Sequence, residues 1–144
     1  MALTIDETIE IDAPAETVWQ VLTDFDRYGE WNTFCYEAAT TLEPGSPIDM
    51  QVQLGPNRRP QREWIRTNTP GAEFSYAMKP VPLGALHSLR SHTVVVLGPN
   101  RTRYESRFTL AGWLSPVVEL ALGKHLRAGF AAMTAGVGKR ATEI

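Results

Sequence analysis

The longest regular pattern of apolar and polar residues lies near the C-terminus. From about Gly112 to Glu143, the larger apolar residues recur at steps of three and four, which places them along one side of an α-helix. These positions are Val118, Leu122, Leu126, Phe130, Met133 and Val137. Ser115 can cap free backbone N–H groups, and Pro116 needs no donor in the first helical turn. The pattern therefore predicts one long amphipathic helix over residues 112–143.

This predicted helix contains unexpected glycines at Gly123, Gly129, Gly136 and Gly138. Each glycine in a helix interior costs roughly 1 kcal/mol relative to alanine, and a position that simply faces solvent would not require it. We therefore expect either that another backbone comes very close to the helix at these positions or that a space beside the helix is kept open.

The N-terminal part of the chain has the pattern of a strand followed by two short helices. Residues 3–11 alternate between apolar and polar side chains, which predicts a half-buried strand. Pro14 can open a helix, with Asp12 or Ala13 as its cap. Asp24 can cap a second, shorter helix, because the residues after it are too rich in turn formers for a long one.

From Phe34 onward the chain consists of strand-length runs separated by Pro, Gly and Asn signals. The runs cover residues 34–42, 47–54, 61–68, 72–79, 86–97 and 101–110. Several alternate cleanly between an apolar and a polar face, as expected for an antiparallel meander. Together with residues 3–11 they predict a seven-stranded antiparallel sheet curled around the long helix. Because a strongly curved sheet cannot meet a straight helix everywhere, this arrangement tends to leave an internal cavity, a common site for a small and mostly apolar ligand.

Composition and charge narrow the class of protein. The 144 residues suit one domain, spanning 1–144, with one substantial core. The formal net charge is −2 and the basic residues are scattered, so nothing favours nucleic acid as a partner. The single cysteine excludes an internal disulfide framework and fits a reducing compartment. With no signal-peptide pattern, and no apolar run near the roughly 18 residues of a membrane span, we expect a soluble cytoplasmic protein.

Several stretches of the sequence carry a resemblance to a known superfamily. They are Ile9–Trp19, Val21–Phe25 and Tyr28–Asn32, followed by Gly98–Arg103, Phe108 and Gly112–Pro116. In order and spacing they resemble the START-like superfamily, also called SRPBCC, which includes polyketide cyclases and dehydrases, the birch-pollen-allergen family and lipid-transfer domains. The resemblance covers nearly the whole chain. It implies an α+β helix-grip fold, in which a curved seven-stranded antiparallel sheet wraps around the C-terminal helix and two short helices follow the first strand. It implies a shared ligand pocket but no shared catalytic motif.

Residues with nucleophilic or metal-binding chemistry are few. Cys35 is the only thiol and no Gly-x-Ser-x-Gly elbow is present, so nucleophilic catalysis has little support. His87, His92 and His125 lack the spacing of metal ligands, and we expect neither a metal nor a cofactor. His87 and His92 are separated by an odd number of positions on one predicted strand, so at most one of them points inward.

Strand parity selects the polar residues that could face the cavity. Ser106 lies between Tyr104 and Phe108 and should face the long helix if the alternation holds. Arg90 and His92 share one face of their strand, but the opposite face is also apolar, and the orientation of this strand stays open. An inward Arg90 would need a partner or an anionic ligand group, because an unpaired buried charge costs several kcal/mol.

Other apolar and aromatic positions are open to more than one interpretation. Trp64 shares one side of its predicted strand with Arg62 and Arg66, and it either belongs to the rim or core or stacks on a ligand. Trp113, where the long helix begins, could close the mouth of the pocket. The apolar segment Pro80–Leu86 either packs against the end of the sheet or forms a lid or a partner contact.

We expect the cavity to bind a small hydrophobic or aromatic, lipid-like or polyketide-like ligand without a metal or nucleotide cofactor. The predicted ligand-binding residues are Met50, Trp64, Tyr76, Arg90, His92, Tyr104, Ser106, Phe108, Leu122, Leu126, Gly129, Phe130 and Met133. The alternative, implied by the resemblance, is a cofactor-independent polyketide cyclase or dehydratase. Its catalytic candidates are Tyr76, His92 and Tyr104, with an inward arginine to steady an enolate. In the other interpretation Tyr76 and Tyr104 have only a packing role, and Arg90 and His92 face solvent. The candidate inward face of the last strand, with Tyr104, Ser106 and Phe108, offers no carboxylate for an acid–base pair, which favours binding over catalysis.

Overall fold

The computed structural model describes residues 2–144 as a curved sheet, two α-helices and two short 3-10 helices. The elements are β1 (Ala2–Ile11), α1 (Ala15–Thr23), η1 (Phe25–Glu30), β2 (Cys35–Ala39), β3 (Pro47–Leu54), β4 (Asn57–Thr69), β5 (Glu73–Ala77), η2 (Pro82–Gly84), β6 (His87–Gly98), β7 (Arg101–Ala111) and α2 (Ser115–Glu143). The order of strands and helices predicted from the sequence is confirmed, and η2 is an addition to it.

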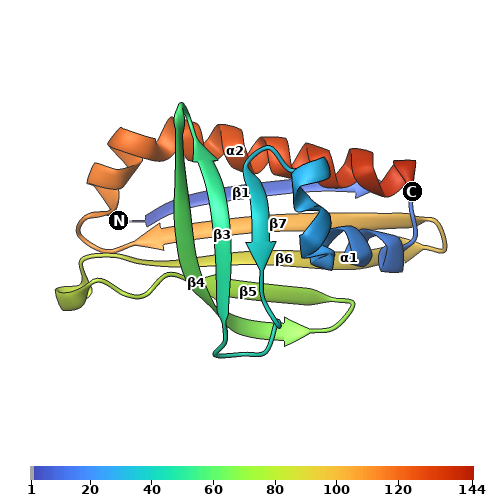
Figure 1. The fold of residues 1–144 in the computed structure, drawn as a ribbon, viewed down its shortest axis with the longest axis horizontal. Helices are drawn as coiled ribbons and strands as arrows, with labels where there is room; N and C mark the ends of the chain where they lie inside the picture. Colours follow the sequence, from blue (N-terminus) through green and yellow to red (C-terminus); the bar gives the residue numbers. More distant parts are fainter. Residues whose placement is uncertain (1) are drawn as a thin grey trace.

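All seven strands belong to one sheet with the order β1-β7-β6-β5-β4-β3-β2. Each neighbouring pair is antiparallel, and β1 closes the meander by pairing with β7 along its whole length, where Ile5 lies opposite Phe108 and Ile9 opposite Tyr104. Figure 1 shows β3 and β4 crossing the direction of β1, β7 and β6, with α2 lying along the sheet. The protein therefore has the helix-grip fold: a strongly curved antiparallel sheet around a long C-terminal helix.

The helix α2 meets the sheet closely over its C-terminal half and less closely over its N-terminal half. Phe130, Met133 and Val137 are buried, whereas Leu122 and Leu126, which continue the same stripe toward the N-terminus, are only partly buried. This difference leaves room between the first half of α2 and the sheet. No helix among residues 2–144 has both the length and the apolar character needed to cross a membrane.

Three of the four glycines of α2 make room for groups from other elements, whereas a Cβ at Gly123 would meet only Cγ of Glu119 in the same helix. A Cβ atom on Gly129 would lie 2.5 Å from Cε1 of Phe34, and one on Gly138 would lie 2.8 Å from Cδ1 of Ile9. At these two positions the expectation of a close backbone or an open space is wrong, because a side chain fills the position. Only at Gly136 does a backbone atom, the carbonyl oxygen of Trp31, also come close, at 3.2 Å from such a Cβ.

Several predicted boundaries and caps are also corrected. The strand predicted over 61–68 begins at Asn57, because Gly55, in the left-handed region with φ of 58°, makes a tight turn that pairs Asn57 with Leu54. The long helix begins at Ser115 rather than near Gly112, whose φ of 112° is not helical. The N-cap positions of α1, η1 and α2 are occupied by Pro14, Asp24 and Leu114, and none of them makes a side-chain capping hydrogen bond.

Candidate functional site

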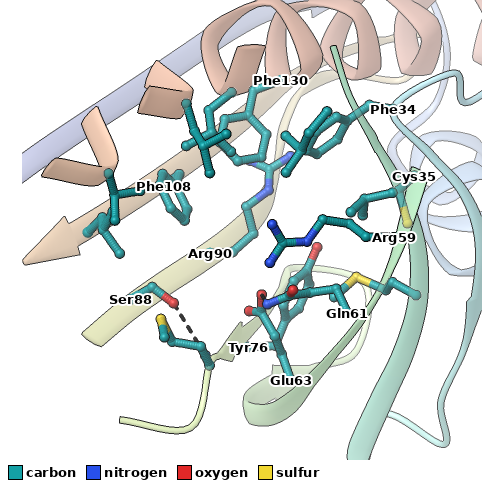
Figure 2. Close-up of a pocket in the computed structure, with 18 of the residues that line it drawn as sticks. Phe34, Cys35, Arg59, Gln61, Glu63, Tyr76, Ser88, Arg90, Phe108 and Phe130 are labelled. Atoms are coloured by element: carbon teal, nitrogen blue, oxygen red, sulfur yellow. Dashed lines mark hydrogen bonds between the residues drawn. The ribbon is translucent and has the colours of Figure 1, made fainter. Parts of the chain in front are cut away.

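A cavity of about 230 Å³ lies between the N-terminal half of α2 and the concave face of the sheet (Figure 2). Its wall comes from all strands from β2 to β7, from the segment that joins η1 to β2 and from α2, and most of it is apolar. A dry cavity of roughly 150 Å³ is enough to hold benzene in another protein. The cavity seen here therefore has room for a ligand larger than one aromatic ring.

Arg90 on β6 forms part of the cavity wall and is 3% exposed. Its guanidinium donates a hydrogen bond from Nη1 to Oγ of Ser106, approaches Sδ of Met133 at 3.5 Å and lies 4.3 Å from the centroid of the Phe130 ring. No aspartate or glutamate in residues 2–144 forms an ion pair with it. Since arginine keeps its charge in proteins, the wall contains a buried cation that makes no direct ion pair with a carboxylate.

Behind the wall, His92 joins two tyrosines in a buried hydrogen-bonded chain. Its Nε2 lies 3.1 Å from the hydroxyl of Tyr76, and its Nδ1 lies 2.6 Å from the hydroxyl of Tyr104. Burial, with a smaller contribution from the charge of Arg90, lowers the pKa of His92 well below its ordinary value. The neutral imidazole has one N–H donor and one acceptor, so one tyrosine donates to the ring and the other accepts from it. Burial also raises the pKa of Tyr76 and Tyr104, which keeps both phenols protonated.

A second polar part of the wall comes from β4. Gln61 Nε2 donates to Oε2 of Glu63 at 3.1 Å, and Arg59 reaches in from the same face of the strand (Figure 2). Burial raises the pKa of the Glu63 carboxyl, while the hydrogen bond from Gln61 and the charge of Arg90 oppose the rise. These three residues were missed as site residues. The signal for them was the alternation that places Glu63 on the side of the apolar Ile65, which is buried in the structure.

The structure resolves the orientation of β6 that the sequence left open. Arg90 and His92 are both buried, whereas His87 is exposed, so only one of the two histidines on this strand points inward. On β7 the predicted alternation is confirmed, with Tyr104 and Ser106 buried.

The residues predicted to bind a ligand fall into two groups. The cavity wall contains Met50, Tyr76, Arg90, Phe108, Leu122, Leu126, Phe130 and Met133. His92, Tyr104 and Ser106 do not line the cavity but lie behind it, bonded to Tyr76 or Arg90.

Trp64 and Gly129 are corrections to the predicted site. Trp64 lies outside the wall because β4 keeps its alternation and turns the opposite face, with Glu63, toward the cavity. Gly129 does not line this cavity because the ring of Phe34 covers it. Phe34 itself is a wall residue that the sequence analysis did not single out.

The Cys35 thiol lies in the wall but is poorly suited to nucleophilic chemistry. Burial raises the pKa of Cys35 to about 12, and its Sγ donates to the backbone oxygen of Glu37 at 3.5 Å. A thiol with such a pKa is almost entirely protonated near neutral pH, while the thiolate is the nucleophile. Within residues 2–144, no cluster of three or more His, Cys, Asp or Glu side chains could hold a metal ion.

Comparison with known proteins gives a match over almost the whole chain. The family model described as polyketide cyclase / dehydrase and lipid transport matches residues 2–140. No curated protein sequence matches significantly. Among solved structures, the Zhui aromatase/cyclase from Streptomyces sp. R1128 is 16% identical with a TM-score of 0.79, over 99% of this chain and 94% of that one. Norcoclaurine synthase from Thalictrum flavum, in complex with dopamine and hydroxybenzaldehyde, is 16% identical with a TM-score of 0.73, over 99% of this chain and 88% of that one. A START superfamily protein from Mycobacterium smegmatis is also 16% identical with a TM-score of 0.73, over 97% of both chains. At these identities the structural likeness establishes the fold alone.

Proposed function

The chain belongs to the family described as polyketide cyclase / dehydrase and lipid transport, and from this premise we propose that its cavity binds a small hydrophobic or aromatic ligand whose oxygen atom pairs with Arg90. The observation that carries the proposal is the buried guanidinium without a carboxylate partner. Burying a charge costs free energy unless hydrogen bonds or an opposite charge offset the lost hydration. A carboxylate, phenolate or carbonyl oxygen of a ligand would offset it at Arg90.

The rest of the wall supports a ligand with an aromatic or aliphatic body. Phe130 stands at the centre of the aromatic part, with the ring centroids of Phe34 and Phe108 at 5.0 and 4.9 Å from its own. Such rings offer edges and faces to a further aromatic group, and each aromatic pair contributes roughly 0.5–1.5 kcal/mol beyond its buried area. Apolar side chains of β3 and α2 complete the enclosure.

The test compares a charged and a neutral ligand of the same skeleton. We expect 2-naphthoate to bind more tightly than 2-naphthalenemethanol in isothermal titration calorimetry, because only the carboxylate compensates Arg90. Arg90→Met should weaken naphthoate binding by roughly 10–100-fold, the loss of one charge-assisted hydrogen bond, and change the affinity for the alcohol much less.

Arg66→Met is the matched control, since Arg66 is exposed on the opposite face of β4. This change should leave both affinities as they are. Equal affinities for the two ligands in the wild-type protein, or equal losses in the two variants, would contradict the proposal. Native mass spectrometry of protein purified from its own source would then identify the ligand that travels with it.

A specific observation also favours a second candidate function, cofactor-independent proton transfer. Glu63 and Tyr76 line the same cavity as Arg90. Burial raises the pKa of Glu63 toward neutral pH, and a carboxyl with a pKa closer to the working pH is a more effective general base. In this scheme the Glu63 carboxylate takes a proton from the carbon next to a ligand carbonyl. The negative charge that develops on the carbonyl oxygen is stabilised by Arg90. The proton then returns from Glu63 to carbon, so the step needs no metal or redox partner.

The proton-transfer scheme has its own test. In heavy water, the wild-type protein should accelerate deuterium exchange at the methyl group of 2-acetylnaphthalene, followed by NMR. Glu63→Gln should slow the exchange while the affinity for the ketone survives. Wild-type exchange no faster than in buffer would leave ligand binding as the function of the cavity.

A further inference from the structure

An exposed apolar surface lies where η2 meets the start of α2. It consists of Leu83, Trp113, Val117 and Leu120, which we call the rim patch. Leu83 and Leu120 are 91% and 90% exposed, and Trp113 and Val117 are 64% and 61% exposed. Figure 1 shows the start of α2 and the end of β7 together at one end of the molecule, while the turn between β6 and β7 lies at the other. Large side chains this exposed contribute little to the core, and exposed apolar groups of this kind mark interaction surfaces.

The backbone holds the rim patch in a defined arrangement. Leu83 has a φ of 64°, in the left-handed region that is sterically costly for leucine, and the strained residue presents its side chain to solvent. The indole Nε1 of Trp113 donates to the backbone oxygen of Leu83 at 3.0 Å, and the backbone N–H of Leu114 donates to the oxygen of Ala85 at 2.9 Å. The loop and the helix start are therefore joined as one unit.

The rim patch and the cavity wall use opposite sides of the first turns of α2. Val118 and Leu122 line the cavity, whereas Val117 and Leu120 lie on the exposed side of the same turns. Leu86, which follows η2, also lines the cavity. The rim patch is therefore an outer surface, separated from the cavity by the body of the helix.

The charges around the rim patch are mostly positive. Residues 79–89 and 111–127 contain the cations Lys79, Lys124 and Arg127 and the single carboxylate of Glu119, which gives these two segments a net charge of +2 in a chain of net charge −2. All three cations are exposed, and Arg127 lies 3.4 Å from Glu119. Tryptophan and leucine flanked by lysine and arginine is the composition of surfaces that bind at the boundary of an anionic membrane.

We propose that the rim patch docks on the surface of a membrane that contains anionic lipids. The apolar side chains enter the boundary between headgroups and acyl chains, while the flanking cations face the lipid headgroups. The proposal goes beyond the proposed function, because docking does not require a ligand in the cavity.

The test is co-sedimentation of the ligand-free protein with vesicles of phosphatidylcholine, alone or with about a third of phosphatidylglycerol. We expect binding to the anionic vesicles that weakens in roughly 1 M salt, where the Debye length falls to about 3 Å. The double variant Leu83→Ser, Leu120→Ser should bind roughly tenfold more weakly or worse. Because both side chains are about nine-tenths exposed, far-UV circular dichroism should show an unchanged fold.

The matched control is Val96→Ser, Leu97→Ser, which makes a similar change in exposed apolar residues next to the turn between β6 and β7. This control should bind vesicles as the wild type does. Tryptophan fluorescence should shift to the blue on binding, and Trp113→Phe should abolish the shift.

Distinct outcomes would overturn the proposal. They are no binding to anionic vesicles, equal losses in the two double variants, or a blue shift that survives Trp113→Phe. A wild-type dimer that becomes a monomer in the Leu83→Ser, Leu120→Ser variant, without vesicle binding, would assign the rim patch to a second copy of the chain. None of these measurements depends on naphthoate binding, so failure of one proposal is distinguishable from failure of the other.

Discussion

Replacing Gly129 by alanine tests how closely α2 and the cavity wall are packed. In an ordinary helix the change from glycine to alanine stabilises by roughly 1 kcal/mol. Here the new Cβ would lie 2.5 Å from Cε1 of Phe34 and closer still to its Cδ1, whereas ordinary contact begins at 3.4 Å. The aromatic ring must therefore move by about 1 Å, from a position in which it contacts the ring of Phe130 edge-on.

The expected result follows from setting these effects against each other. Overpacking of a core position costs about 1–3 kcal/mol, and a disturbed aromatic pair costs about 0.5–1.5 kcal/mol. Against the helix gain of roughly 1 kcal/mol, the net effect of Gly129→Ala is a loss of roughly 0.5–3.5 kcal/mol in the free energy of unfolding. At Gly123 a new Cβ would meet only Cγ of Glu119, at 3.4 Å. Gly123→Ala should therefore stabilise the protein by roughly 0.5–1 kcal/mol.

Urea-induced unfolding followed by circular dichroism measures both variants in one assay. The two substitutions are chemically identical and lie in the same helix, so helix propensity cancels between them. A Gly129→Ala protein as stable as Gly123→Ala would refute the close packing of Phe34 against α2. Because Phe34 lines the cavity, Gly129→Ala should also weaken 2-naphthoate binding, while Gly123→Ala should not.

Further predictions concern the dependence on pH and the glycine Gly112, which precedes α2. The free energy of unfolding should fall as pH drops below about 6.5, by up to about 1.4 kcal/mol per pH unit, because His92 has a lowered pKa in the folded state and gains its proton only on unfolding. His92→Gln should remove this component of the slope in urea titrations repeated at several pH values. The affinity for 2-naphthoate should fall as pH rises through the raised pKa of Glu63, because a second carboxylate then faces the ligand; Glu63→Gln should flatten that dependence in calorimetry. Gly112→Ala should cost about 2–3 kcal/mol in urea unfolding, since Gly112 has a φ of 112° and a Cβ there would lie 2.6 Å from the carbonyl carbon of Ala85.

The fold was predictable from the sequence because its signals are local and agree with one another. Alternation in the strands, turn residues between them and a long apolar stripe at the C-terminus all indicate the same architecture. The orientation of β6 was not predictable in this way, because both of its faces carry apolar residues. It is fixed by pairing with neighbours, which places Arg90 opposite Tyr76 on one side and opposite Phe108 on the other.

The two misplaced site residues, Trp64 and Gly129, have different causes. Trp64 was chosen for its side-chain type, although the alternation of β4 already placed Glu63, not Trp64, on the side of the buried Ile65. Whether Gly129 lines the cavity depends on Phe34, whose ring fills the space beside it and which lies far away in the sequence. The periodicity of the helix does not predict where the ring of Phe34 lies. Parity along a strand is a local property, whereas the partner of a helix position is decided by the tertiary fold.

Two features of this molecule lower its stability when it has neither a ligand nor a partner. Arg90 is buried among a hydroxyl, a thioether and an aromatic ring, none of which cancels its charge, and an apolar side chain of similar length would fill the same space without the cost of desolvating a cation. Leu83 adopts a strained backbone conformation and presents its side chain to water. Neither arrangement serves the packing of the sheet against α2. A ligand with an apolar body and a single polar end would relieve the cost at Arg90, because its polar end would pair with the buried guanidinium. A membrane surface would remove the exposed Leu83 side chain from water.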